Sequence, residues 1–183
     1  MKKIIFLDID GVVALDKQFF MNRAKFHKKH PAMAELRVPY PWDEGAVKIL
    51  NEILDATDAE IVLSSDWRLH WDLNELKGIF TWNGVKKSPI AVTPNIIEKM
   101  SSDLEDERQF QIQTFKREHK PESWVAIDDL DMSFSLGDHF FKTKSGMGIK
   151  QTGLKEKIIN KLNSNLFSHN FKKNIIFKNF IWS

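Results

Sequence analysis

Cysteine is missing from the 183-residue chain. Disulfide bonds and thiolate chemistry are therefore excluded, and the composition fits a reducing compartment. Long apolar runs are missing as well, because no stretch approaches the roughly 20 apolar residues of a membrane-spanning helix. The first apolar run, Ile4–Leu7, ends in an acidic residue and does not resemble a signal peptide. We therefore expect a cytoplasmic protein with no membrane partner.

A strong net charge is also missing. The formal charge is only +2, so the field of the whole molecule does not by itself indicate nucleic-acid binding. Hydrophobic residues make up 42% of the sequence, which suits a globular chain of one domain with a modest insertion. We expect this domain over 1–163, with a small insertion at about 15–40. Residues 164–183 form a basic, aromatic extension that fits an edge strand, a partner-binding tail or a nucleic-acid contact.

The first acidic motif directly follows the apolar run Ile4–Leu7. Four strand-forming residues before a turn predict a strand buried on both faces, as in the centre of a parallel sheet. Asp8 and Asp10 then stand at its carboxyl end, where open α/β sheets bind ligands. Because the two carboxylates project the same way, they repel each other unless a cation separates them or one binds a proton. Gly11 allows a sharp turn and close approach of a ligand.

The same four residues, Asp-Ile-Asp-Gly, also fit a hairpin turn or a helix N-cap. A calcium loop fits less well, because the glycine of such a loop is its sixth residue and Gly11 is the fourth of this motif. The motif alone does not distinguish a structural turn from a functional site, so the interpretation depends on the downstream motifs.

The segment from Leu15 to Tyr40 is basic and aromatic and is too long for an ordinary strand-to-helix connection. We interpret it as a small lid over the carboxyl edge of the sheet whose charge draws in an anionic substrate, although a solvated helix face fits equally well. A helix capped by Asp43 follows and ends near Thr57. Its apolar stripe predicts that it covers the sheet.

A second short strand, Glu60–Leu63, ends in Ser64 and Ser65. We expect a helix capped by Ser65 or Asp66 to follow, with an apolar stripe of Leu69, Leu73, Leu76 and Phe80. The serine hydroxyls, the N–H groups of that helix and Arg68 are suited to bind a phosphate dianion. A helix cap beside a surface arginine is the simpler alternative.

The helix predicted over Asp103–His119, with Ser101 or Ser102 as its cap, carries a cation on its apolar face. Arg108 falls on the stripe of Leu104, Ile112 and Phe115. A cation on a buried face needs an anionic partner. A third buried strand, Trp124–Ile127, then ends in Asp128 and Asp129. Ile90–Val92 predicts an edge strand, His139–Thr143 a fourth strand, and Thr152 the cap of a last helix.

Strands that alternate with helices predict an α/β fold, a three-layer Rossmann-like parallel sheet with helices on both faces. The carboxyl ends of parallel strands lie on one edge, so the two acidic motifs and the serines converge there. Several carboxylates without Cys or His form a hard oxygen site that suits Mg²⁺.

This order of motifs resembles the haloacid dehalogenase (HAD) superfamily of phosphohydrolases from Ile4 to about Leu162, with a small or minimal cap. The wording Ser64-Ser65-Asp66-Trp67-Arg68, with Thr152-Gly153-Leu154 near the end, is similar to the small HAD domains found in RNA repair proteins. The small cap leaves room for a bulky or polymeric substrate.

The resemblance implies a role for each motif residue. Asp8 is the expected nucleophile that forms an aspartyl-phosphate, and Asp10 the expected general acid and base. Ser64 binds the phosphoryl group and Arg108 neutralises its charge, although Ser65 and Lys116 compete for these two roles. Asp128 and Asp129 hold Mg²⁺ together with Asp8 and the Asp10 carbonyl oxygen.

The expected function is therefore Mg²⁺-dependent hydrolysis of phosphomonoesters, on nucleotides, nucleic-acid ends or small phosphorylated molecules. Six tryptophans that could stack on bases give weak support for a nucleic-acid substrate. Two alternatives stay open, a catalytically weak nucleic-acid-binding or scaffold domain and a phosphotransferase with an acceptor other than water. The sequence does not indicate the oligomeric state.

Overall fold

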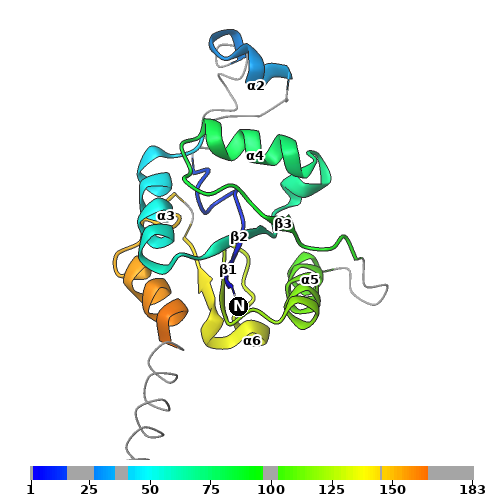
Figure 1. Ribbon diagram of the computed structural model, residues 1–183, viewed down its shortest axis with the longest axis vertical. Helices are drawn as coiled ribbons and strands as arrows, with labels where there is room; N and C mark the ends of the chain where they lie inside the picture. The colour runs from blue at the N-terminus through cyan, green and yellow to red at the C-terminus, as the bar shows by residue number, and fades with distance from the viewer. Residues whose placement is uncertain (1, 16–26, 36–40, 97–102, 145, 165–183) are drawn as a thin grey trace, which may run out of the picture.

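The computed structural model describes residues 2–15, 27–35, 41–96, 103–144 and 146–164. Its centre is a parallel sheet with the strand order β3-β2-β1-β4-β5 (Figure 1). The strands are β1 (Lys3–Leu7), β2 (Glu60–Leu63), β3 (Ala91–Val92), β4 (Ser123–Asp128) and β5 (Phe140–Lys142). This arrangement confirms the predicted α/β fold.

Helices cover both faces of the sheet, as expected for parallel strands joined by crossovers. Figure 1 shows α3 and the helix at 154–164 on one side and α5 on the other. The helices are α2 (Pro31–Glu35), α3 (Glu44–Thr57), α4 (Leu73–Trp82), α5 (Leu104–His119), α6 (Ser133–Leu136) and the residues 154–164, and the 3₁₀ turns are η2 (Asp66–Leu69) and η3 (Gly137–His139).

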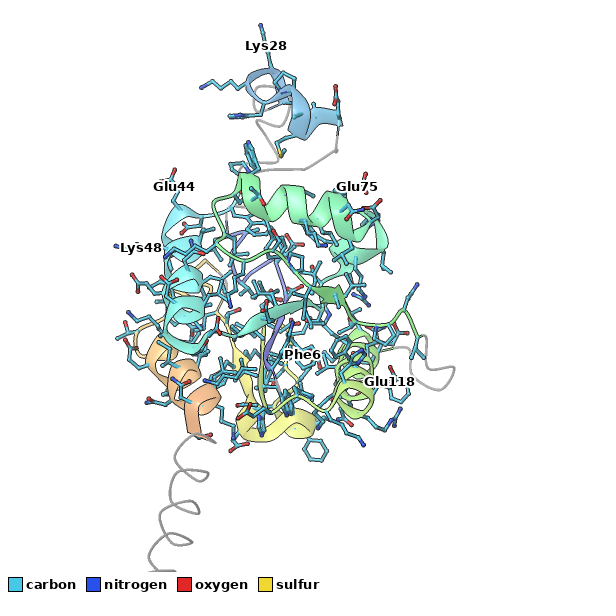
Figure 2. The ribbon with its side chains drawn as sticks, viewed as in Figure 1. Phe6, Lys28, Glu44, Lys48, Glu75 and Glu118 are labelled. Carbon is cyan, nitrogen blue, oxygen red and sulfur yellow. The ribbon has the colours of Figure 1, made fainter. Side chains whose placement is uncertain are left out.

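The two hydrophobic clusters explain why β1 is central. Ile5 and Leu7 pack with the apolar faces of α3, α4 and the 154–164 helix, whereas Ile4 and Phe6 pack with α5 and α6. Phe6 lies in the middle of the molecule in Figure 2 and contacts Phe115 of α5 edge-on. Because successive strand residues face opposite ways, a run of four apolar residues fills both layers.

One predicted helix start and one predicted helix length were wrong. The N-cap of α5 is Asp103, whose carboxylate accepts a hydrogen bond from Glu105 N; Ser101 and Ser102 lie outside the described residues. The helix expected after Ser65 is in fact two elements, η2 and α4. Asp72 and Glu75 form a capping box that starts α4 afresh, because each of these side chains accepts an N–H bond from the other residue.

Two residues assigned to apolar stripes are instead open to solvent. Leu69 is 51% exposed in η2, and Leu104 is 44% exposed in the first turn of α5. Leu69 lies outside the stripe because the chain turns between η2 and α4. The core-facing stripe of α5 begins at Arg108, one turn after Leu104.

Only part of the predicted lid belongs to the described residues, since 16–26 and 36–40 lie outside them. Within the described part, Pro31 begins α2, where a proline at the first helical position is well tolerated. His30 packs edge-on against Trp82 of α4. Lys28 lies at the periphery of the molecule, beyond α4 (Figure 2). The covering role of this segment stays a prediction.

The last predicted segment is the basic, aromatic extension at 164–183. Residues 165–183 lie outside the described part, so the nature of the basic extension also stays a prediction. Among the residues that are described, we find no helix with the length and apolar character needed to cross a membrane.

Candidate active site

Each strand of the sheet delivers a buried polar residue to the carboxyl edge. Asp8 N donates to Ile127 O at 3.0 Å and Ser64 N donates to Leu7 O at 2.9 Å, so the hydrogen-bond ladder continues one residue past β1 and β2. The residues at this level are Thr93, Ser64, Asp8, Asp128 and Thr143, in the order of the strands. Parallel register therefore brings residues from five chain segments to one edge.

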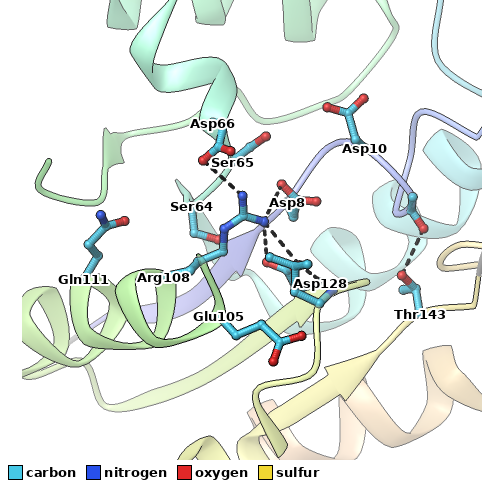
Figure 3. Close-up of polar contacts among 12 residues, drawn as sticks. Asp8, Asp10, Ser64, Ser65, Asp66, Glu105, Arg108, Gln111, Asp128 and Thr143 are labelled. Carbon is cyan, nitrogen blue, oxygen red and sulfur yellow. Dashed lines mark hydrogen bonds and ion pairs between the residues drawn. The ribbon is translucent and has the colours of Figure 1, made fainter. Parts of the chain in front are cut away.

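Arg108 joins the acidic residues of this edge. Its Nη1 lies 3.2 Å from Asp8 Oδ1 and 3.0 Å from Asp128 Oδ2, and its Nη2 lies 3.1 Å from Asp66 Oδ1 (Figure 3). The side chains of Arg108, Asp8 and Asp128 are nearly inaccessible to solvent. The partner that a cation on the buried face of α5 requires is thus supplied by two strands and η2.

The electrostatics of the edge are those of a crowded anion site. Burial raises the pKa of Asp8 well above its ordinary value, and the neighbouring charge of Asp128 raises it further, while Arg108 and a hydrogen bond with Ser65 act against this rise. Burial likewise raises the pKa of Asp128. Burial lowers the Arg108 pKa, but Asp8 and Asp128 more than compensate, so it is raised and the guanidinium stays charged.

The two candidate serines have different surroundings. Ser65 is the N-cap of η2, its hydroxyl accepts from Trp67 N at 3.5 Å, and it also bonds the Asp8 carboxyl. The Ser64 hydroxyl is buried and has no hydrogen-bond partner among the described residues. A buried hydroxyl without a partner costs free energy, which a bound phosphoryl oxygen would recover. This difference favours Ser64 as the phosphate ligand.

Three carboxylates fit a divalent cation. One oxygen each from Asp8, Asp128 and Asp129 lies within 4.8 Å of the others, and this oxygen-only set suits Mg²⁺ with retained waters. Gly11 makes room for the set, because a Cβ there would lie only 2.6 Å from Asp129 Cγ. Among the described residues, the Asp10 carboxylate is not part of this group; a contribution from its carbonyl oxygen stays a prediction.

Sequence reasoning missed two side-chain contacts that η2 makes at the site. Asp66 was considered only as a cap, but it pairs with Arg108, and the Trp67 indole N–H donates to Asp10 Oδ2 at 2.8 Å. Arg68 donates to the carbonyl oxygen of Ser65 at 2.7 Å and to Gln111 of α5. Their position in the sequence could have indicated a role at the site, since all these residues directly follow a strand that ends there.

The competing cation lies elsewhere. Lys116 Nζ is 4.7 Å from the centre of the Trp124 ring, a cation–π contact two turns further along α5 than Arg108. The structure thus brings Asp8, Ser64, Ser65, Arg108, Asp128 and Asp129 together, with Asp10 at the rim, and leaves Lys116 outside.

Comparison with known proteins agrees with this arrangement. No curated protein and no solved structure matches the chain. One family model, described as the HAD domain in Swiss Army Knife RNA repair proteins, matches residues 4–154 and so includes every candidate site residue. The chain therefore belongs to the family of HAD domains found in Swiss Army Knife RNA repair proteins.

Proposed function

We propose that this HAD domain is a Mg²⁺-dependent phosphomonoesterase that uses Asp8 as its nucleophile. Membership of the family indicates phosphatase-type chemistry in general. The observation that carries the specific proposal is the contact of the Arg108 guanidinium with both Asp8 and Asp128. The Ser64 hydroxyl nearby has no partner within the described part of the chain. Phosphoryl transfer needs positioning and charge compensation, and this arrangement supplies both.

The proposed reaction has two steps. The Asp8 carboxylate attacks phosphorus, and the bond to the leaving group breaks. The leaving oxygen keeps the electron pair of that bond and accepts a proton from Asp10. The Asp10 carboxylate then accepts a proton from a water molecule that attacks the aspartyl-phosphate. Inorganic phosphate leaves and the Asp8 carboxylate is restored.

The other residues bind and compensate charge. The Ser64 hydroxyl donates to a phosphoryl oxygen, and Arg108 offsets the negative charge that develops on the group. Mg²⁺ held by the buried Asp8 and Asp128 and by the exposed Asp129 would keep the two buried carboxylates ionised and offset further phosphoryl charge. Asp66 holds the far side of the guanidinium, which fixes its orientation.

For the substrate we propose the phosphorylated end of a nucleic acid or a nucleotide. The support is the family, whose description names RNA repair proteins. A small lid would also leave the site open to a polymer. The alternatives, a binding domain without turnover and transfer to another acceptor, use the same residues and are outcomes of the test.

The test is phosphate release by the full chain with Mg²⁺ and with chelator, using an aryl phosphate, nucleotides, sugar phosphates and oligonucleotides phosphorylated at either end. Chelator-sensitive release supports the proposal, and preference for an oligonucleotide end supports the substrate assignment. If none of these substrates releases phosphate, the proposed phosphatase activity is refuted. Product formation that requires an added acceptor indicates a phosphotransferase.

A metal titration tests the cation site separately from turnover. We compare Asp129→Asn with Asp131→Asn, an exposed acid nearby that pairs with Lys142. We expect Mg²⁺ to raise the unfolding temperature of the wild type and of Asp131→Asn. If Asp129→Asn binds tenfold more weakly, it loses about 1.4 kcal/mol of that stabilisation at high Mg²⁺. Equal stabilisation of both variants excludes Asp129 as a ligand.

A further inference from the structure

The contact between Trp67 and Asp10 joins the rim of the site to the core. Trp67 Nε1–H donates to Asp10 Oδ2 at 2.8 Å, although Asp10 itself is exposed. Trp67 is only 5% exposed, and its ring packs against Trp42 and Trp71 at centroid distances of 6.1 and 4.8 Å. A rigid, buried ring thus holds a carboxyl group that faces solvent.

We propose that Trp67 is a positioning residue that orients the Asp10 carboxyl for proton transfer to the leaving oxygen. The inference rests on the phosphatase function proposed above. A carboxyl group on an exposed aspartate turns readily about its terminal torsion. The indole N–H restricts that rotation through a hydrogen bond that is neutral while Asp10 is protonated and charge-assisted, hence stronger, once Asp10 is ionised.

The chemistry of the donor specifies which oxygen transfers the proton. An indole N–H only donates, so it pairs with the carboxylate and also with the carbonyl oxygen of the protonated group. With Oδ2 bound to Trp67, the proton of the acid form resides on Oδ1. Asp10 Oδ1 therefore gives its proton to the leaving oxygen in the first step and accepts one from water in the second.

Leaving-group dependence separates this role from a purely structural one. The departure of 4-nitrophenolate needs little help from an acid, whereas phenolate is more basic and needs a proton. The ratio kcat/KM reports the first step, the attack of Asp8. We expect Trp67→Phe to lower kcat/KM for phenyl phosphate about tenfold, a fraction of the 10²–10⁴-fold typical of general acid catalysis. The value for 4-nitrophenyl phosphate should fall much less.

The matched control is Trp42→Phe. Trp42 is as buried as Trp67 and packs against it, but its Nε1–H has no hydrogen-bond partner among the described residues. We expect this variant to change both substrates by the same factor. If Trp67→Phe does not fold, 3-benzothienylalanine at position 67 removes the N–H at almost unchanged ring size.

The outcomes are distinct. A selective loss with phenyl phosphate in the position-67 variant supports the inference. An equal loss with both substrates, or none, overturns it while the phosphatase function stands. A wild-type enzyme that hydrolyses neither substrate, nor any member of the wider panel, overturns the function and this inference with it.

Discussion

Arg108 compensates charge where burial alone would keep the acids protonated. Asp8 and Asp128 are both buried and both carry a raised pKa. One guanidinium contacts both groups and favours their ionised forms. At this scale, the site is a small set of charges whose balance depends on one cation from α5.

Replacement of the proposed nucleophile gives the first prediction. Asp8→Asn keeps the shape of the side chain, so we expect far-UV circular dichroism to stay unchanged. Phosphate release should fall by at least about 10³-fold, the scale seen when a catalytic nucleophile is removed. A rate within a factor of about ten of wild type would exclude Asp8 as the nucleophile.

Removal of the cation gives the second prediction. Arg108→Ala leaves two buried carboxylates without their partner, so we expect a loss of about 3–5 kcal/mol in metal-free stability together with a raised KM. Lys116→Ala removes a cation from the same helix outside the site and should leave the kinetics unchanged. The reverse pattern, normal kinetics for Arg108→Ala and a defect for Lys116→Ala, would transfer the role to Lys116.

The raised pKa values predict the pH dependence of stability. Asp8 and Asp128 bind protons in the folded protein at pH values where the unfolded chain, with an ordinary pKa of 3.8, has released them. The free energy of unfolding from these groups therefore decreases as the pH rises from 3.8 through the raised values.

We expect the metal-free wild type to lose more stability over this pH range than Asp128→Asn, which lacks one of the two acids. Surface acids such as Asp131, whose pKa is lowered, act in the opposite direction but are common to both proteins. Urea unfolding at a series of pH values measures the difference. Identical pH profiles would show that the pair does not bind the extra protons.

At the scale of elements, two short turns add side chains to those that the strands place at the carboxyl edge of the sheet. The turn after β1 places Asp10 and Gly11 above the edge, where the Gly11 carbonyl accepts from the Thr143 hydroxyl at 2.9 Å. The 3₁₀ turn η2 sends Asp66 to Arg108 and Trp67 to Asp10. The strands thus fix the floor of the site, and these turns fix its rim.

Alanine variants of Gly11 and Gly84 test the effect of backbone strain separately from that of a steric clash at the site. Gly11 and Gly84 both have positive φ, at 73° and 79°, but only at Gly11 would a Cβ meet Asp129. Both alanine variants should lose about 1–2 kcal/mol from the left-handed conformation. Only Gly11→Ala should also lose stabilisation by Mg²⁺ and phosphatase activity. If Gly84→Ala shows the same losses, the collision is not the cause.

At the scale of the whole molecule, the Arg108 guanidinium comes from one of the two helical layers that pack against the sheet. The layer of α5 and α6 packs on Ile4 and Phe6, and the layer of α3 and α4 packs on the other side of β1. Arg108 reaches the carboxyl edge because Ile112 and Phe115 seat α5 against the sheet. The position of the guanidinium therefore depends on the packing of one face.

Ile112 and Ile53 are a matched pair for testing this dependence. Both are fully buried on helices, Ile112 on α5 and Ile53 on α3. Each alanine variant should lose about 2–5 kcal/mol of stability. At a temperature where both are folded, Ile112→Ala should raise KM and Ile53→Ala should not. Equal KM values would show that α5 holds Arg108 without this contact.

The sequence by itself determined the sheet, the parallel direction of its strands and the acids at its edge. Those features are local, since an apolar run followed by Asp8 or by Asp128 and Asp129 needs no distant information. Arg108 was also predictable, because a cation on an apolar stripe requires a buried anion. The family description agrees with the resemblance that these motifs indicate.

Only the tertiary structure decided which side chains share the rim. Asp66 meets Arg108 and Trp67 meets Asp10 across 42 and 57 residues, respectively. Nothing in the local pattern distinguishes such contacts from a helix cap and a core tryptophan. They arise because parallel register aligns the strand ends and because the chain forms η2 before α4 begins, which turns consecutive side chains toward different partners.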